Sequence, residues 1–407
     1  MSDEKNSQTI DLSTLIQAYT DPYERYHTLC KQDSIYYDTR NQCWLVTGYD
    51  AVTYLLGDAR FSAELNQAQS TAPRRRAAPS FLETAVYQQI LFKEGKIHQE
   101  CRAILLRKLK QIQKEIPAQI QAITAHLLEA LQKQKTFDLV TDFSHPFSVL
   151  VIAHVLGLPL DNLAELLQLA HWSDTHGHIT SGYVRVDLRD VDKLGNYFRQ
   201  LLAVKRATPG DDLISELLAV NPFEQENELI ANCMMLFSAG RMTTMKLLAN
   251  GIPLLLQAWE TYREQLAHDP AYTERLTEEL LRMVTPTRYA TRHALADVNL
   301  AAKFPGNHLI LRGAKVILFL EAANHDPNQF ANSEDFDATR RPNRHLAFGF
   351  GSHYCPGAQL ARLEIQIALQ GLLGAFTQLY ASPDPQPVWN PNPNLGGYDK
   401  YCLHSVA

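Results

Sequence analysis

From about residue 97 onward, apolar residues recur three and four positions apart over long stretches of the chain. This is the spacing of one face of an α-helix. The predicted helices span residues 98–116, 118–133, 147–160, 162–174, 191–206, 212–220, 226–266 and 359–376. The 226–266 segment is about 40 residues long, against ~8–20 for most globular helices. Its middle is apolar all round, so we expect it to cross the core.

Shorter runs rich in aromatic and β-branched residues predict strands. Residues 34–47 hold two such runs split by a polar turn, which indicates a hairpin. Similar runs lie at 298–300, 308–312 and 314–320. The fold class is therefore mostly α with a smaller β region, and we expect a single domain over residues 1–407.

Three stretches carry little periodic signal. The first 20 residues are polar and are expected to be loose, before a short helix over 21–32 that an Asp-Pro pair begins. Residues 62–95 predict a long irregular loop, of the kind that usually binds something or is disordered. The tail from Ser382 is rich in Pro and Asn.

Composition narrows the class of protein. The 407 residues are 45% hydrophobic and 20% charged, as in an ordinary globular protein. A net charge of −6 argues against wholesale nucleic-acid binding. The chain shows neither an uninterrupted run of ~18 apolar residues nor a secretory signal. Six cysteines without a CxxC pair predict neither a disulfide scaffold nor a structural zinc site. We expect a soluble cytoplasmic protein with no membrane partner.

A glycine-punctuated loop delivers one cysteine, Cys355, directly before the last predicted helix. Gly349, Gly351 and Gly357 allow conformations and close approaches that a Cβ would block. The N-terminus of the following helix favours a thiolate. A lone thiolate suits an axial haem ligand, with Phe348 shielding one side of the sulfur. Against this, a lone cysteine is usually a small buried hydrophobe.

The spacing of Phe348, Gly351, Cys355 and Gly357 resembles the haem-binding signature Phe-x-x-Gly-x-x-x-Cys-x-Gly of the cytochrome P-450 superfamily. Other stretches resemble family segments in the family's order, namely residues 209–215, 279–282, 324–327 and 336–340. The resemblance runs from Asp21 to the tail. It implies the cytochrome P-450 fold, a haem b cofactor, and a soluble bacterial-type monooxygenase that activates dioxygen to oxidise a small organic molecule in secondary metabolism.

By the same resemblance, particular side chains hold the haem and its surroundings. Four residues match the family's partners of the haem propionates: His98, Arg102, Arg292 and His353. Glu279 and Arg282 match a structural Glu-x-x-Arg pair, which by similarity extends to Arg340 or Arg341.

The long helix carries Ala239-Gly-Arg-Met-Thr-Thr244, which resembles the family's oxygen-binding pattern. Small residues such as Gly240 make room for dioxygen. Thr243, followed by Thr244, helps to deliver protons. The departure is Met242, where the family usually has a carboxylate, because a thioether cannot relay a proton.

Three accounts of Met242 stay open. Water with Thr243 suffices, or the substrate brings the missing acid, or the reaction is atypical, such as oxidative coupling of phenols. A peroxide-driven enzyme and a non-catalytic haem sensor are further alternatives. Arg241, next to Met242, could hold a substrate carboxylate, although an arginine on a helix face usually pairs with another group of the protein.

Substrate and partners are implied more loosely. Arginines cluster on segments that line the pocket in this family, which hints at an anionic or carrier-bound substrate. The candidate contacts are Arg74, Arg75, Arg76, Arg241, Met242, Arg288 and Tyr289. No flavin or iron–sulfur motif occurs in the sequence, so we expect electrons from a separate ferredoxin and its reductase. Arg107, Lys108 and Lys110 could attract such an acidic partner.

Overall fold

The computed structural model describes residues 34–64, 88–180, 188–269, 271–306, 308–390 and 392–406. The expected loose N-terminus, the helix at 21–32 and Arg74–Arg76 lie outside these ranges.

Helices form most of the described chain, which confirms the predicted fold class. The α-helices are α3 (Tyr49–Gly57), α5 (Gly95–Ile112), α6 (Ile116–Leu131), α7 (His145–Leu156), α8 (Leu163–Thr180), α9 (Leu188–Ala207), α10 (Leu213–Val220), α11 (Glu226–Leu255), α12 (Trp259–His268), α13 (Tyr272–Val284), α14 (Leu320–Asn324) and α15 (Ala358–Ala375). Shorter helical turns are η2 (Ile90–Phe92), η3 (Leu139–Ser144), η4 (Leu256–Ala258) and η5 (Gly351–His353).

The predicted helix of about 40 residues is wrong in its length. Helix α11 has 30 residues and is followed by the turn η4 and by α12. Pro253 lies in the last turn of α11 and offers no N–H to continue the ladder. Ala258 then leaves helical geometry, with φ −129° and ψ 29°. As expected, α11 crosses the core, where it packs on α7, α8, α9, α13 and α15.

Within the described ranges, the strands form four small sheets. They are β1 (Ile35–Asp38), β2 (Cys43–Val46), β3 (Phe61–Ser62), β4 (Thr136–Asp138), β5 (Tyr289–Ala294), β6 (Val298–Asn299), β7 (Leu309–Ile310), β8 (Lys315–Phe319), β9 (Gln378–Ala381), β10 (Val388–Asn390), β11 (Gly397–Lys400) and β12 (Cys402–Val406). The largest sheet has the order β1-β2-β8-β5-β3. It contains the predicted hairpin, with Ile35 opposite Val46.

Some elements escaped prediction because their partners are remote in the chain. Strands β10, β11 and β12 lie in the tail, where Pro and Asn hide the alternation of a strand. Strand β12 pairs with β4, more than 260 residues earlier, and with β9. Helix α3 was not predicted either, although its Ala51, Val52, Leu55 and Leu56 form a buried stripe.

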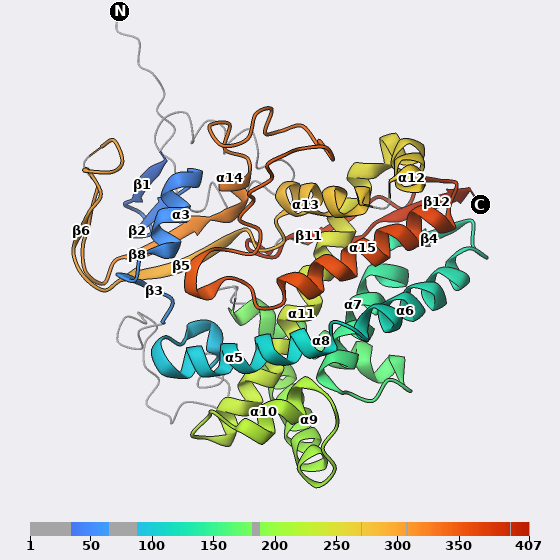
Figure 1. The fold of residues 1–407 in the computed structure, drawn as a ribbon, viewed down its shortest axis with the longest axis horizontal. Helices are drawn as coiled ribbons and strands as arrows, with labels where there is room; N and C mark the ends of the chain where they lie inside the picture. The colour runs from blue at the N-terminus through green and yellow to red at the C-terminus, as the bar shows by residue number, and fades with distance from the viewer. Residues whose placement is uncertain are drawn as a thin grey trace, which may run out of the picture.

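The molecule has a sheet side and a helical side. Figure 1 shows the sheet of β1, β2, β8 and β5 with α3 at one side, most helices at the other, and α11 between them. The helical side contains the largest cluster of buried apolar residues, and a second cluster lies under α3 and the sheet. In the described ranges, one helical stretch, Leu139–Leu156, is apolar and long enough to cross a membrane, and 72% of it is buried inside the fold.

Candidate active site

The loop before α15 holds Cys355 in one position. Gly349 and Gly351 have positive φ values of 70° and 76°. A Cβ on Gly351 would lie 2.7 Å from the carbonyl oxygen of Leu56, so only glycine fits this turn. The Cys355 N–H donates to the Phe348 carbonyl at 2.9 Å. Because α15 begins at Ala358, the predicted placement of the thiol before a helix is confirmed.

The protonation of Cys355 differs from the sequence-based expectation. Burial raises the pKa of the thiol, and the nearby backbone N–H of Gly357 opposes the rise only in part. Pro356, between them, has no N–H to offer. The helix N-terminus alone therefore does not hold a thiolate here, whereas a coordinated metal ion deprotonates a thiol outright.

Phe348 is fixed by a charged group behind it. The guanidinium carbon of Arg362 lies 4.6 Å from the centre of the Phe348 ring. Glu278 accepts hydrogen bonds from Arg362 at 2.7 and 3.0 Å. Although burial raises the pKa of Glu278, hydrogen bonds from His345 and Arg362 bring it down to about 2. This ion pair holds one side of the cysteine loop in place.

Two predicted histidines meet at Glu94, just before α5. The rings of His98 and His353 lie 4.3 Å apart between centroids, and His353 Nε2 is 3.1 Å from Glu94 Oε1. Burial lowers the pKa of His353 to about 4, with Arg292 adding to the effect and Glu94 opposing it. Burial also raises the pKa of Glu94, but hydrogen bonding by the Ala63 N–H and the nearby His353 outweighs this and lowers it.

The predicted arginines complete this cluster. Arg292, on β5, is buried, and burial lowers its pKa while Glu94 raises it. Arg102, on α5, donates to the Tyr354 carbonyl at 2.5 Å, next to Cys355. The fold thus brings together all four predicted propionate partners from three distant segments. The cluster thus holds two permanent cations, of which Arg292 acts on one carboxylate, Glu94, which the sequence reasoning missed.

One face of α11 is partly open at the middle of the helix. Ala239 is exposed and Thr243 is half-buried, although both lie in the middle of a core helix. Thr243 Oγ1 donates to the Ala239 carbonyl at 2.8 Å. Gly240 faces elsewhere, since a Cβ there would lie 2.4 Å from Ile152 Cδ1 of α7. The small size of Gly240 therefore serves helix packing, which corrects the expectation that it makes room for dioxygen.

Thr244 turns away from this face toward α15. Its Oγ1 donates to Glu364 Oε2 at 2.7 Å, and both side chains are buried. Burial raises the pKa of Glu364 to about 8, with the Thr244 hydrogen bond opposing the rise. Glu364 is a second residue that sequence reasoning missed. Its signal was an acid on an apolar helix, nine residues after Cys355.

Two predicted substrate contacts are wrong. Arg241 is 0% exposed and lies on the face of α11 opposite Ala239 and Thr243. Its Nη2 donates to Asp174 and, at 2.8 Å, to Ser173 Oγ, both on α8. Arg288 is also buried, with its Nε 3.5 Å from a carboxylate oxygen of Glu321. Both guanidinium charges are matched inside the protein, so neither presents itself to a substrate.

The predicted partner patch is smaller than expected. Lys108 is buried and forms an ion pair with Asp211. Arg107 forms an ion pair with Glu216. Lys110 remains exposed on the same helix, α5.

The Glu279–Arg282 pair is confirmed. Arg282 donates to both Glu279 oxygens at 2.7 and 2.9 Å, with both side chains fully buried. Arg340 completes the group at 3.2 Å from the same carboxylate, whereas Arg341 is exposed. The network ties α13 to the segment that leads to the cysteine loop.

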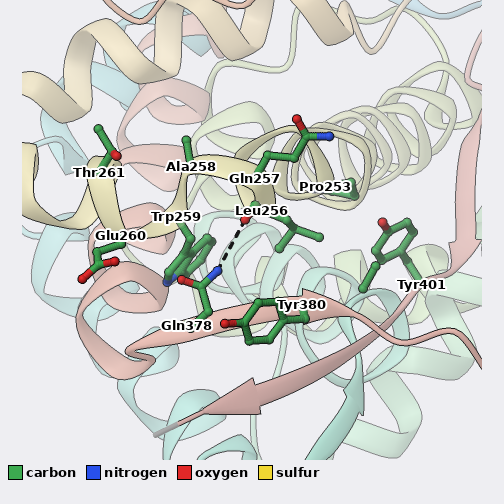
Figure 2. A pocket seen from close by; sticks show the side chains of 11 residues that line it. Pro253, Leu256, Gln257, Ala258, Trp259, Glu260, Thr261, Gln378, Tyr380 and Tyr401 are labelled. Carbon is green, nitrogen blue, oxygen red and sulfur yellow. Dashed lines mark hydrogen bonds between the residues drawn. The ribbon is translucent and has the colours of Figure 1, made fainter.

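A hollow of about 610 Å³ lies away from these residues, between the start of α12 and the strand β9. Figure 2 shows Tyr380, Tyr401 and Gln378 on its strand side, with Gln378 donating to the Leu256 carbonyl. It contains none of the predicted site residues.

The residues at the cysteine loop fit a haem. Nowhere in the described part of the chain do three His, Cys, Asp or Glu side chains gather as a metal site would require. A single thiol held just before a helix suits an iron whose other ligands come from a macrocycle. The surplus of positive charge around Glu94 suits buried carboxylates, which need such partners in a dry site.

Comparison with known proteins agrees with this reading. The family model described as "Cytochrome P450" matches residues 211–396. The chain is 31% identical to a "Biotin biosynthesis cytochrome P450" of Bacillus subtilis (strain 168), over 88% of this chain and 90% of the relative. It is 30% identical to the "Polyketide biosynthesis cytochrome P450 PksS" of the same organism, over 88% and 87%. Among solved structures, P450BioI in complex with hexadec-9Z-enoic acid ligated acyl carrier protein superposes with a TM-score of 0.83 and 28% identity, covering 96% of this chain and 100% of that one.

Proposed function

The chain belongs to the cytochrome P450 family and is a monooxygenase, and from this premise we propose that it uses haem b bound through Cys355. The cofactor would supply dioxygen activation, which a thiolate ligand assists by donating electron density. The observation that carries the proposal is one thiol held by a glycine-constrained loop, next to the cluster of Arg102, Arg292, His98 and His353 near Glu94.

In this proposal the chain's own residues divide the work. Cys355 provides the axial sulfur, and the Gly357 N–H moderates its basicity. Phe348, backed by Arg362, keeps water from one side of the loop. The propionates would be held by His98, Arg102, Arg292 and His353.

Proton delivery would rest on the threonine pair of α11. Thr243 offers a hydroxyl on the partly exposed face of α11. This hydroxyl can give up its proton if another group supplies a new one. Met242 is buried and cannot relay a proton. Glu364 keeps its proton at neutral pH and is bonded to Thr244, so it supplies an acid that α11 itself lacks.

We propose a small organic substrate from secondary metabolism. Support comes from relatives whose names place them in biotin and polyketide biosynthesis. A carrier-bound substrate is supported by the P450BioI complex with an acylated carrier protein. The buried ion pairs of Arg241 and Arg288 remove two of the reasons for an anionic substrate.

Electrons would come from a ferredoxin and its reductase in the cytoplasm, with Lys110, exposed on α5, helping the acidic partner to dock. A peroxide-driven reaction is the second candidate, because Met242 occupies the position where the family usually has a carboxylate. Product formation with hydrogen peroxide alone, and none with ferredoxin and reductase, would favour that alternative.

The test of the thiolate is spectroscopic. The reduced protein under carbon monoxide should show the red-shifted Soret band of a thiolate-ligated haem, and Cys355→Ala should lose it. Cys101→Ala is the control, because Cys101 is also a buried thiol with a raised pKa. An unchanged carbon monoxide spectrum in Cys355→Ala would contradict the proposal.

A further inference from the structure

Helix α11 contains a buried lysine one turn beyond its oxygen-binding motif. Lys246 is 3% exposed, and its Nζ lies 2.7 Å from Asp399 Oδ1, 3.0 Å from the Tyr398 carbonyl and 3.5 Å from that of Gly397. An ammonium has three donors, so one short segment of β11 takes all of them. Burial lowers the pKa of Lys246, and Asp399 counteracts this.

A second residue of α11 fixes the same segment. The Asn250 side chain accepts from the Tyr398 N–H at 2.9 Å and donates to the Gly396 carbonyl at 3.3 Å. Gly397 has a φ of 150°, and a Cβ there would lie 2.4 Å from the Asn250 amide. The backbone at residue 397 therefore approaches α11 more closely than any other residue type would allow.

The other end of this segment is bound to the strand β5. The Arg288 N–H donates to the Asn394 carbonyl at 3.0 Å, and the Tyr289 N–H donates to the Asn394 side-chain oxygen at 3.0 Å. Residues 392–399 thus bridge α11, which bears Thr243, and β5, which bears Arg292. Both of these elements carry predicted site residues, so the bridge is placed to form a wall between them.

We propose that Lys246 is a positioning residue that sets this wall, residues 392–399, and thereby the size and shape of substrate that the site accepts. The inference rests on the proposed haem site. Lys246 acts through the wall and touches no reacting atom. Asp399 is about half exposed, so it can exchange its bond to Lys246 for water, whereas the two carbonyls would lose a charged donor. Without that ammonium, the hydrogen bonds of Asn250 to residues 396 and 398 remain between α11 and this segment.

Two azoles of different size test the proposal on the ferric holoprotein. Imidazole needs only the iron, whereas 4-phenylimidazole must also pack its ring against the pocket walls. In Lys246→Met the dissociation constant of 4-phenylimidazole should rise about tenfold, the change expected for one lost charge-assisted hydrogen bond. The dissociation constant of imidazole should stay within about twofold. Asp399→Asn should shift the ratio of the two constants in the same direction and by less.

Lys205→Met is the matched control. Lys205 is also buried and forms an ion pair of 2.6 Å with Asp212, but it lies on α9, away from the wall. Lys205→Met should lower the melting temperature as Lys246→Met does, but it should leave the ratio of azole affinities unchanged. An unchanged ratio in both Lys246→Met and Asp399→Asn would overturn the proposal. The carbon monoxide spectrum of each variant separates this result from failure of the haem site itself.

Discussion

Glu364 is a carboxyl group that the fold keeps neutral. It is only 3% exposed, and its hydrogen bond from Thr244 is too little to stabilise the charged form. Cys355 follows the same rule, since burial outweighs a single N–H neighbour. At the scale of single residues, desolvation therefore decides which groups around the site carry protons when the cofactor is absent.

The pH dependence of stability should report on Glu364. Its pKa is about 8 in the folded state, against 4.5 for an ordinary glutamate. Between these values the folded protein keeps a proton that the unfolded chain has lost, so stability falls as pH rises through this window. Glu364→Gln removes this effect. The unfolding free energy of the variant minus that of the native protein should therefore increase as the pH rises from 5 to about 8.

Urea unfolding at a series of pH values measures the difference. Thr244→Val is the companion variant. It removes the hydrogen bond that lowers the pKa of Glu364, so it should extend the window to higher pH. Parallel pH profiles for the native protein and Glu364→Gln would show that Glu364 is ionised in the folded state.

The variant Met242→Glu tests whether the missing acid limits catalysis. With Glu at this position, α11 would carry a carboxyl beside Thr243, and a larger share of the electrons consumed should end in product. The measure is product formed per NADPH oxidised, with ferredoxin and reductase supplied. A lower share would mean that Met242 is an adaptation of this chain. Because residue 242 is buried, we also expect the variant to unfold more easily.

Packing between elements depends on a few points of close approach. Helix α11 meets α7 at Gly240, where the Ile152 side chain fills the space that a Cβ would take. Helix α15 meets α11 through Glu364 and Thr244. These contacts set the distance between the helix that bears Thr243 and the helix that follows Cys355.

Gly240→Ala should destabilise the protein. The new methyl group would lie 2.4 and 2.8 Å from two carbon atoms of Ile152. Overpacking of this kind costs about 1–3 kcal/mol, more than the ~0.5–1 kcal/mol that Ala gains over Gly inside a helix. The free energy of unfolding, measured in urea, should therefore fall.

Two variants control this experiment. Gly374→Ala makes the same change in α15, where nothing lies within 4 Å, and should stabilise the protein or leave it unchanged. Ile152→Ala removes the atoms that clash, so Gly240→Ala should cost less in that background. An equal cost in both backgrounds would show that the contact with α7 is not the reason.

At the scale of the whole molecule, the positive charge on α5 is largely compensated. Lys108 and Arg107 are neutralised by acids of the segment 211–216, which leaves Lys110 exposed on α5. With a net charge of −6, the chain as a whole would repel an acidic redox partner. Local positive charge must therefore guide the partner to this face.

Lys110→Glu should slow reduction of the ferric protein by an acidic ferredoxin. Stopped-flow measurements should show the largest difference at low salt, shrinking as ions screen the charges. Arg107→Gln should have a smaller effect, because Glu216 already pairs with that guanidinium. Equal rates for Lys110→Glu and the native protein at low salt would place the docking face elsewhere.

Much of this organisation follows from local order in the sequence. Helical periodicity predicts α5 to α10 and α15, and β-branched runs predict the hairpin of β1 and β2, because each pattern reflects neighbours in the chain. The cysteine loop was also identified, since a motif of fixed spacing marks it, and resemblance to the family named the four residues that the fold brings together beside it. Glycines at 349 and 351 have the left-handed backbone that the turn requires.

What only the tertiary structure decided is the environment of each side chain. Arg241, Arg288 and Lys108 read as free cations in the sequence, yet each is buried against an acid from another segment. Glu94 and Glu364 read as ordinary acids, yet they lie among the site residues. Exposure and charge compensation are sums over contacts between distant segments, so no local pattern encodes them, whereas a helix or a signature loop is written within a few turns of chain.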